Sequence, residues 1–196
     1  MRIVLASSNK HKVQEINEIT SRISDGVEFV LPPTDFDPEE NGETFEENSY
    51  IKAKAAWEIS HSWVLADDSG LCIDSLGGKP GIYSARYAET PALRIERVLN
   101  EMKDIPPAKR SAHFTCAMTL INPEGEIAYK VEGICNGSIV ESARGINGFG
   151  YDPIFLVEGD TRTMAELSED EKNEISHRSV ALRKVIDFLR SKKWVL

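Results

Sequence analysis

The sequence predicts an α/β protein with a mixed central sheet. Short apolar segments rich in β-branched residues alternate with segments of helical periodicity, which is typical of helices packed on a sheet. In the middle of the chain, two long strand-like segments follow each other across a clear turn and add antiparallel strands. With 196 residues, the chain is long enough for one domain, 1–196, or for two lobes that share one sheet, and it shows no flexible linker.

The first third of the chain predicts two strands and two helices. Residues 2–6 are typical of a short buried strand, and residues 28–31 of a second strand that ends at two prolines. The helix between them is expected to face inward through Val13, Ile16, Ile19 and Thr20, with Glu15 and Glu18 facing outward. A second helix is predicted to begin at Thr44, where Thr44 and Glu47 fit a capping box, and to end near Ser60.

The rest of the chain predicts four further strand segments and two helices. A buried strand over 63–66 runs into Asp67-Asp68-Ser69-Gly70, and a glycine-rich loop at 77–81 precedes a helix over 92–102. Strands are expected over 111–121, 127–134 and 137–140, with a turn at 122–125 and a further apolar segment at 154–157. In the last helix, the apolar residues recur at i, i+3, i+4 and i+7: Leu182, Val185, Ile186 and Leu189.

Composition narrows the class of function. The chain has 23 Lys and Arg against 32 Asp and Glu, a formal net charge of −9, and no long basic segment, which argues against a nucleic-acid partner. No apolar run is long enough to span a membrane, and the N-terminus does not resemble a signal peptide. Cys72, Cys116 and Cys135 are odd in number and widely spaced, which indicates reduced thiols. We therefore expect a cytoplasmic protein.

The start of the first helix carries unusual charge. Its first turn contains three basic residues, Lys10, His11 and Lys12. Cations at this end oppose the helix dipole and cost about 0.3–1 kcal/mol each. A bound anion reverses that cost, and the preceding Ser7, Ser8 and Asn9 have short side chains able to bind phosphate oxygens. The segment predicts a phosphate site, with a solvated basic helix end capped by Asn9 as the alternative.

Adjacent carboxylates follow the strand over 63–66. Functional groups in α/β proteins gather at the carboxyl ends of strands, and neighbouring side chains of a strand point to opposite faces, so one of Asp67 and Asp68 is expected to enter a given cleft. Mg²⁺ prefers carboxylates together with substrate phosphate oxygens, and the acidic loop over 39–43 offers a second ligand. The alternative is an ordinary Asp-Gly turn with a capping carboxylate.

Two further features are ambiguous by themselves. His177 and Arg178 stand at the start of the last helix, where acidic residues are favoured, and they are either ligand contacts or a surface helix end. Phe149 and Tyr151 lie in a glycine-rich loop, where they either stack on a base or fill the core.

Taken together, these segments resemble the inosine/xanthosine triphosphate pyrophosphatases, a family that removes deaminated purine nucleotides from the precursor pool. The resemblance covers nearly the whole chain, apart from residues 89–109, which carry no motif. The matching motifs in order are Ser7-Ser8-Asn9-Lys10-His11-Lys12, Gly42 to Asn48 with Lys52, Ala66 to Leu71, Gly81 to Arg86, Gly148-Phe149-Gly150-Tyr151-Asp152-Pro153, and Glu171-Lys172 with Ser176-His177-Arg178.

The resemblance implies an elongated mixed sheet flanked by helices, two lobes around a substrate cleft, and a homodimer. It further implies Mg²⁺ and the conversion of ITP, dITP and XTP to the monophosphate and pyrophosphate. Glu40 and Asp68 would bind the metal, and Asp68 would also be the general base. The implied substrate contacts are Ser7, Ser8, Asn9, Lys10, His11, Lys12, Lys52, Ser69, Phe149, Gly150, Tyr151, Asp152, Lys172, His177 and Arg178.

Two rival hypotheses remain open at this point. A Maf-type nucleotide pyrophosphatase has a similar N-terminus but no obvious counterpart to the segments over 149–153 and 176–178. A nucleotide-binding sensor without turnover would have no need of a general base such as Asp68.

Overall fold

The computed structural model describes residues 1–23, 26–32 and 36–194, and it confirms an α/β fold. The helices are α1 (Lys10–Ile23), α2 (Phe45–Ser60), α3 (Pro91–Glu101), α4 (Glu169–Ile175) and α5 (His177–Ser191). The strands are β1 (Arg2–Leu5), β2 (Glu28–Val30), β3 (Val64–Ile73), β4 (Ser111–Ile121), β5 (Ile127–Ile139) and β6 (Phe155–Val157). Short 3₁₀ helices cover Asp74–Leu76, Gly81–Arg86, Pro107–Lys109, Asp152–Ile154 and Met164–Glu166.

The six strands form one mixed sheet in the order β2-β1-β3-β4-β5-β6. Strand β1 pairs in parallel with β2 and β3, whereas β5 pairs antiparallel with β6, as the mixed pattern of the sequence predicts. Strands β3, β4 and β5 are long, and each contributes residues to both of the compact units into which the chain divides. None of the helices in the described part of the chain is long and apolar enough to cross a membrane.

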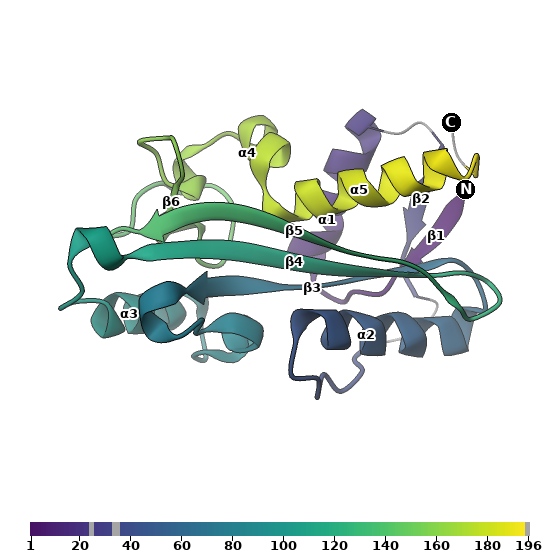
Figure 1. The fold of residues 1–196 in the computed structure, drawn as a ribbon, viewed down its shortest axis with the longest axis horizontal. Coiled ribbons are helices and arrows are strands. Elements are labelled where there is room, and N and C mark those ends of the chain that lie inside the picture. Colours follow the sequence, from purple (N-terminus) through teal and green to yellow (C-terminus); the bar gives the residue numbers. More distant parts are fainter. Residues whose placement is uncertain (24–25, 33–35, 195–196) are drawn as a thin grey trace. The chain divides into compact units, whose positions relative to one another are not determined.

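The first unit comprises 1–68, 116–133 and 178–196. Its sheet is buried on both faces: alternate residues of β1 and β3 contribute to two different cores. Helices α1 and α5 cover one face, with Ile16 and Leu182 fully buried, and α2 covers the other through Ala53 and Ala56 (Figure 1). The capping box at the start of α2 is present as predicted, which fixes where this helix begins.

The second unit comprises 69–115 and 134–177. Its core joins the C-terminal part of β3, helix α3, the loop before β6 and β6 itself, through residues that include Ile73, Val98, Tyr151 and Phe155. Helix α4 lies in this unit and was not predicted, because its seven residues are mostly charged and show no apolar period. Its beginning is nevertheless marked by a capping box between Ser168 and Glu171.

Three of the sequence predictions are wrong in detail. The strands expected over 127–134 and 137–140 are one continuous strand, β5. Asp67 and Asp68 neither end a strand nor form a turn, since β3 continues through them to Ile73. Glu15 does not face outward: it is buried on the inner side of α1, with 6% of its surface exposed.

Candidate active site

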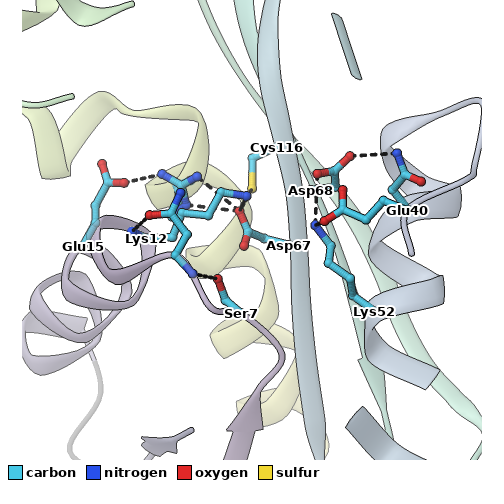
Figure 2. A network of polar contacts seen from close by, with 11 residues as sticks. Ser7, Lys12, Glu15, Glu40, Lys52, Asp67, Asp68 and Cys116 are labelled. Carbon is cyan, nitrogen blue, oxygen red and sulfur yellow. Dashed lines mark hydrogen bonds and ion pairs between the residues drawn. The ribbon is translucent and has the colours of Figure 1, made fainter. Parts of the chain in front are cut away.

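The two adjacent carboxylates of β3 lie in the first unit and face opposite sides of the sheet (Figure 2). Asp67 contacts Lys12 and Arg178 on the side covered by α1 and α5. Asp68 contacts Lys52 on the side covered by α2. This arrangement follows from the alternation of side chains along a strand, and it separates the pair into two distinct polar clusters.

Asp67 is the centre of the first cluster. Its Oδ2 lies 3.0 Å from the Lys12 Nζ and accepts hydrogen bonds from Nε and Nη2 of Arg178 at 3.3 and 3.2 Å. Arg178 also donates to Glu15 through Nη1, so one guanidinium joins two carboxylates. Burial raises the pKa of Asp67, but the charges of Lys12 and Arg178 outweigh it and hold that pKa well below its usual value.

The first cluster explains why Glu15 is buried, although the sequence analysis expected this side chain to face outward. A buried guanidinium needs compensating carboxylates, and Arg178 is 1% exposed. The sequence does contain a signal for this role: Glu15 stands four residues before the buried Ile19, on the same helix face.

Asp68 is the centre of the second cluster. Its Oδ1 lies 3.0 Å from Lys52 Nζ, and the same ammonium is 3.2 Å from Glu40 Oε1. Burial raises the pKa of Asp68, Lys52 opposes that rise, and Glu40 adds to it, with a net shift above the usual value. For Lys52, burial lowers the pKa, but Asp68 and the neighbouring carboxylates outweigh it and keep the amine protonated.

The second cluster has the chemistry of a Mg²⁺ site. Two carboxylates, Glu40 and Asp68, meet at one ammonium, which leaves an excess of negative charge. Within the described residues, no group of three or more His, Cys, Asp or Glu side chains is placed to hold a metal. Magnesium usually takes only one or two protein carboxylates and completes its shell with water and substrate phosphates, so the residues present fit this ion.

The sequence left two alternatives for the start of α1, a phosphate site and a basic helix end capped by Asn9, and the structure has features of both. Asn9 caps the helix, because its Oδ1 accepts from the Lys12 N–H at 3.4 Å, and the Asn9 N–H donates to Ser7 Oγ at 3.2 Å. Ser8 and Asn9 are exposed, whereas Ser7 is buried. Lys12 forms an ion pair with Asp67, so its positive charge is compensated without a bound phosphate or other anion. The side chains of Lys10 and His11 lie outside the described part of the structure.

A third cluster lies in the second unit and joins the 145–153 loop to α4. Lys172 Nζ donates to Asp152 Oδ2 at 2.7 Å and lies 4.6 Å from the centroid of the Phe149 ring. The same Asp152 oxygen accepts the Phe149 N–H at 2.8 Å. Gly148 has φ +71°, and a Cβ there would lie 2.1 Å from that oxygen, so the loop requires glycine. Asp152 thus holds both an aromatic ring and a lysine in place.

The four remaining residues of the predicted site lie in the second unit, where two are buried and two are partly exposed. Tyr151 is 5% exposed and donates through its hydroxyl to the Ser84 carbonyl at 2.9 Å, so it is part of the core. Burial raises its pKa far above the usual range. His177 stacks on Phe114, with ring centroids 4.9 Å apart, and is also buried. Ser69 and Gly150 are partly exposed.

Asn48 is a site residue that the sequence analysis did not single out. It is fully buried in α2, and its Nδ2 donates to Asp68 Oδ2 at 3.3 Å. Its spacing of four residues from Lys52 puts both side chains on one helix face, which is the signal that could have found it.

Comparison with known proteins gives a consistent result over nearly the whole chain. The model of the Ham1 family matches residues 3–188. A dITP/XTP pyrophosphatase of Bacillus cereus is 48% identical over 189 residues, covering 94% of this chain and 92% of that protein. A dITP/XTP pyrophosphatase of Bacillus subtilis is 47% identical over 193 residues, with 96% of each chain covered.

A solved structure agrees with these sequence matches. The Ham1 protein of Staphylococcus aureus superposes with a TM-score of 0.86 at 38% identity, covering 98% of this chain and 100% of that one.

Proposed function

Because the chain belongs to the Ham1 family, we propose that it hydrolyses non-standard purine nucleoside triphosphates to the monophosphate and pyrophosphate. Its substrates are ITP, dITP and XTP, and the reaction removes deaminated purines from the nucleotide pool. The names of the Bacillus relatives support this assignment, since both are dITP/XTP pyrophosphatases of nearly the same length as this chain.

The observation that carries the proposal is the cluster around Asp68. This cluster contains a buried carboxylate with a raised pKa, a protonated lysine 3.0 Å from it, and a second carboxylate beside that lysine. Such a combination suits hydrolysis of a charged substrate. A protein that only bound nucleotide would need carboxylates to hold Mg²⁺, but it would not need one that also accepts a proton from water.

In the proposed reaction, water attacks the α-phosphorus and the α–β bridging oxygen departs with pyrophosphate. Asp68 orients the water and accepts its proton. Lys52, together with the start of α1 from Ser7 to Lys12, binds the phosphates and offsets their charge. Glu40 and Asp68 would hold Mg²⁺, which would supply polarisation of the phosphoryl oxygens and offset developing negative charge.

The nucleoside contacts are proposed to come from Ser69, Phe149, Gly150, Tyr151, Asp152, Lys172, His177 and Arg178. Within this set, Phe149 and Lys172 are the best placed, since Asp152 fixes both and leaves the ring only partly buried. Arg178 is included on the resemblance alone, because its guanidinium binds Glu15 and Asp67 in the structure.

The choice of base follows from hydrogen-bond polarity. Hypoxanthine and xanthine carry an acceptor oxygen at C6, whereas adenine carries a donor amino group. Lys172 can only donate, so adenine would leave two donors facing each other in a closed pocket. Sites built to bond one polar group can reject an analogue that lacks it by large factors.

We also propose a homodimer and a reducing compartment, in line with the resemblance. All three cysteines, Cys72, Cys116 and Cys135, are free thiols, and burial raises the pKa of Cys135 to about 11. Protonated thiols of this kind suit the cytoplasm. Light scattering of the purified protein tests the dimer directly.

A substrate panel tests the proposed function. Pyrophosphate release is measured with Mg²⁺ and ITP, dITP, XTP, GTP and ATP, with 5-methyl-dCTP and TTP as controls for Maf-type activity. We expect turnover of ITP, dITP and XTP far above the others. Preference for the two pyrimidine controls would instead support the Maf-type hypothesis, and tight binding of ITP without turnover would support the sensor.

A further inference from the structure

The side chain of Asn48 connects two separate parts of the Asp68 cluster. Its Nδ2 donates to Asp68 Oδ2 at 3.3 Å, and its Oδ1 accepts the Gly42 N–H at 2.9 Å. Asp68 belongs to β3, whereas Gly42 belongs to the loop that carries Glu40. One amide therefore bridges the strand and the loop that supply the two carboxylates of the cluster.

Asn48 is better explained by this bridge than by the helix that contains it. Asparagine is a poor helix former, and a fully buried amide is costly unless both of its ends are bonded. Here the two carboxylate oxygens of Asp68 have different donors from the same helix, Lys52 at Oδ1 and Asn48 at Oδ2. Two donors one helical turn apart restrict rotation of the carboxylate.

Asn48 is also a neutral donor, and that matters for the charge of the cluster. Lys52 already places one positive charge between Asp68 and Glu40. A second cation at position 48 would neutralise the two carboxylates and remove the attraction for a divalent ion. An amide orients Asp68 without adding charge.

The loop side of the bridge is closely fitted. A Cβ on Gly42 would lie 2.8 Å from Asn48 Oδ1 and 2.8 Å from Glu47 Cβ, both closer than real Cβ contacts. Only glycine allows the loop backbone to approach Asn48 this closely. Glu40 is two residues away, so the Gly42–Asn48 bond limits how far its carboxylate can move.

We propose that Asn48 is a positioning residue, which orients Asp68 and tethers the Glu40 loop so that both carboxylates bind one divalent cation. This inference rests on the proposed function for its catalytic consequence. Its effect on cation binding is independent of which nucleotide is hydrolysed.

The direct test is Mn²⁺ binding to the nucleotide-free protein, followed by electron paramagnetic resonance, with Mn²⁺ as a probe for an oxygen-ligand site. We expect Asn48→Ala to weaken Mn²⁺ binding about tenfold to hundredfold, the usual effect of losing an outer-shell partner. With Mg²⁺ and ITP, kcat should fall by a similar factor while KM changes little, because the described side-chain bonds of Asn48 are to Asp68 and Gly42, whereas the proposed phosphate ligands Ser7 to Lys12 stand at the start of α1.

Ser49→Ala is the matched control. Ser49 is the next residue of α2, is also fully buried, and bonds Thr119 Oγ1 at 2.7 Å, so its loss tests a purely structural effect. This variant should keep wild-type Mn²⁺ affinity and kcat even if its melting temperature falls. Asn48→Asp keeps the side-chain volume but places a second acceptor against Asp68, and it should lower kcat as well.

Gly42→Ala disrupts the same Gly42–Asn48 contact from the loop side. This variant provides the test if the Asn48 variants do not fold. It should weaken Mn²⁺ binding, and its effect should not add to that of Asn48→Ala. Equal Mn²⁺ affinity in wild type, Asn48→Ala and Gly42→Ala, or no Mn²⁺ binding by the wild type, would overturn the inference. Failure of the wild type to hydrolyse ITP, dITP and XTP would overturn the proposed function instead, whatever the Mn²⁺ result.

Discussion

Asp67 and Asp68 are consecutive residues of β3, yet each meets a different lysine at 3.0 Å on opposite faces of the sheet. Asp67 is paired with Lys12 and with the buried Arg178, and its pKa is depressed. Asp68 is paired with Lys52, which also pairs with Glu40, and the pKa of Asp68 is raised. The same residue type therefore has two roles: a structural ion pair on one face and a candidate general base on the other.

The Asp68→Asn variant tests whether Asp68 acts as the general base, because it changes the chemistry of this residue while leaving the fold intact. Asparagine keeps the shape of Asp68 and removes a charge that burial disfavours, so the variant should fold with a melting temperature near that of the wild type. Turnover of ITP should fall about 10²- to 10⁴-fold, the range of a lost general base. Steady-state kinetics measure this loss, with Asp104→Asn, an exposed carboxylate, as the control. Rates like those of the wild type would remove Asp68 from its role.

The Asp67→Asn variant should act on stability and should depend on pH. Removing one partner of a buried ion pair costs about 3–5 kcal/mol, so the free energy of unfolding should drop by that amount at pH 7. The folded-state pKa of Asp67 is depressed, so its stabilisation is complete above the ordinary aspartate pKa of about 3.9 and is lost as pH falls below it.

Urea unfolding of both proteins between pH 7 and pH 3 measures this dependence. The difference in unfolding free energy should be constant down to about pH 4 and should shrink below it. A difference that stays constant through pH 3 would show that the charge of Asp67 is not what stabilises this face.

Lys172→Met should reduce discrimination between bases. Loss of a hydrogen bond to the C6 oxygen costs about 1–3 kcal/mol, which corresponds to a fall of roughly tenfold to hundredfold in kcat/KM for ITP. The low activity with ATP should not fall and should rise slightly, since adenine has no acceptor at C6 and methionine removes the donor that faces its amino group. Lys103→Met removes an exposed lysine of the same unit and should leave both rates unchanged. An equal loss for ITP and ATP would argue against a role of Lys172 in base choice.

Phe149→Ala should weaken binding without changing the preference between bases. Stacking on an aromatic ring contributes about 1–3 kcal/mol per base and tolerates any base, because every base has a π face. The KM should therefore rise in similar proportion for ITP and for any purine triphosphate that is turned over. Competition by a series of purine monophosphates measures the same effect at equilibrium. A loss confined to 6-oxopurines would show that the ring acts through Lys172, which lies 4.6 Å from its centroid.

The sequence predicts best the elements whose signal lies within the element itself, such as a helix cap or an apolar period. The capping box of Thr44 and the apolar stripe of α5 are local features, and both were located correctly. The continuous β5 was divided in two because Cys135, Asn136 and Gly137 interrupt the β-branched pattern, although the strand has neighbours on both sides. Strand pairing between distant segments overrides local preference there.

The candidate site shows the same division between local and distant information. The position of Asp68 on its own face of β3 follows from strand alternation, which is a local rule. The inward position of Glu15 has a local signal in its spacing from Ile19, but its partner Arg178 could not be predicted, because it lies 163 residues further along the chain. The role of Asn48 depends in the same way on Gly42 and Asp68 meeting in three dimensions.

The central claim is that water attacks the α-phosphorus of a 6-oxopurine triphosphate, and isotope labelling tests it most directly. ITP is hydrolysed with Mg²⁺ in ¹⁸O-labelled water, and the products are followed by ³¹P NMR. We predict inosine monophosphate and pyrophosphate as the only products, with the label in the monophosphate alone. Label in the pyrophosphate, or the appearance of inosine diphosphate and inorganic phosphate, would contradict the account.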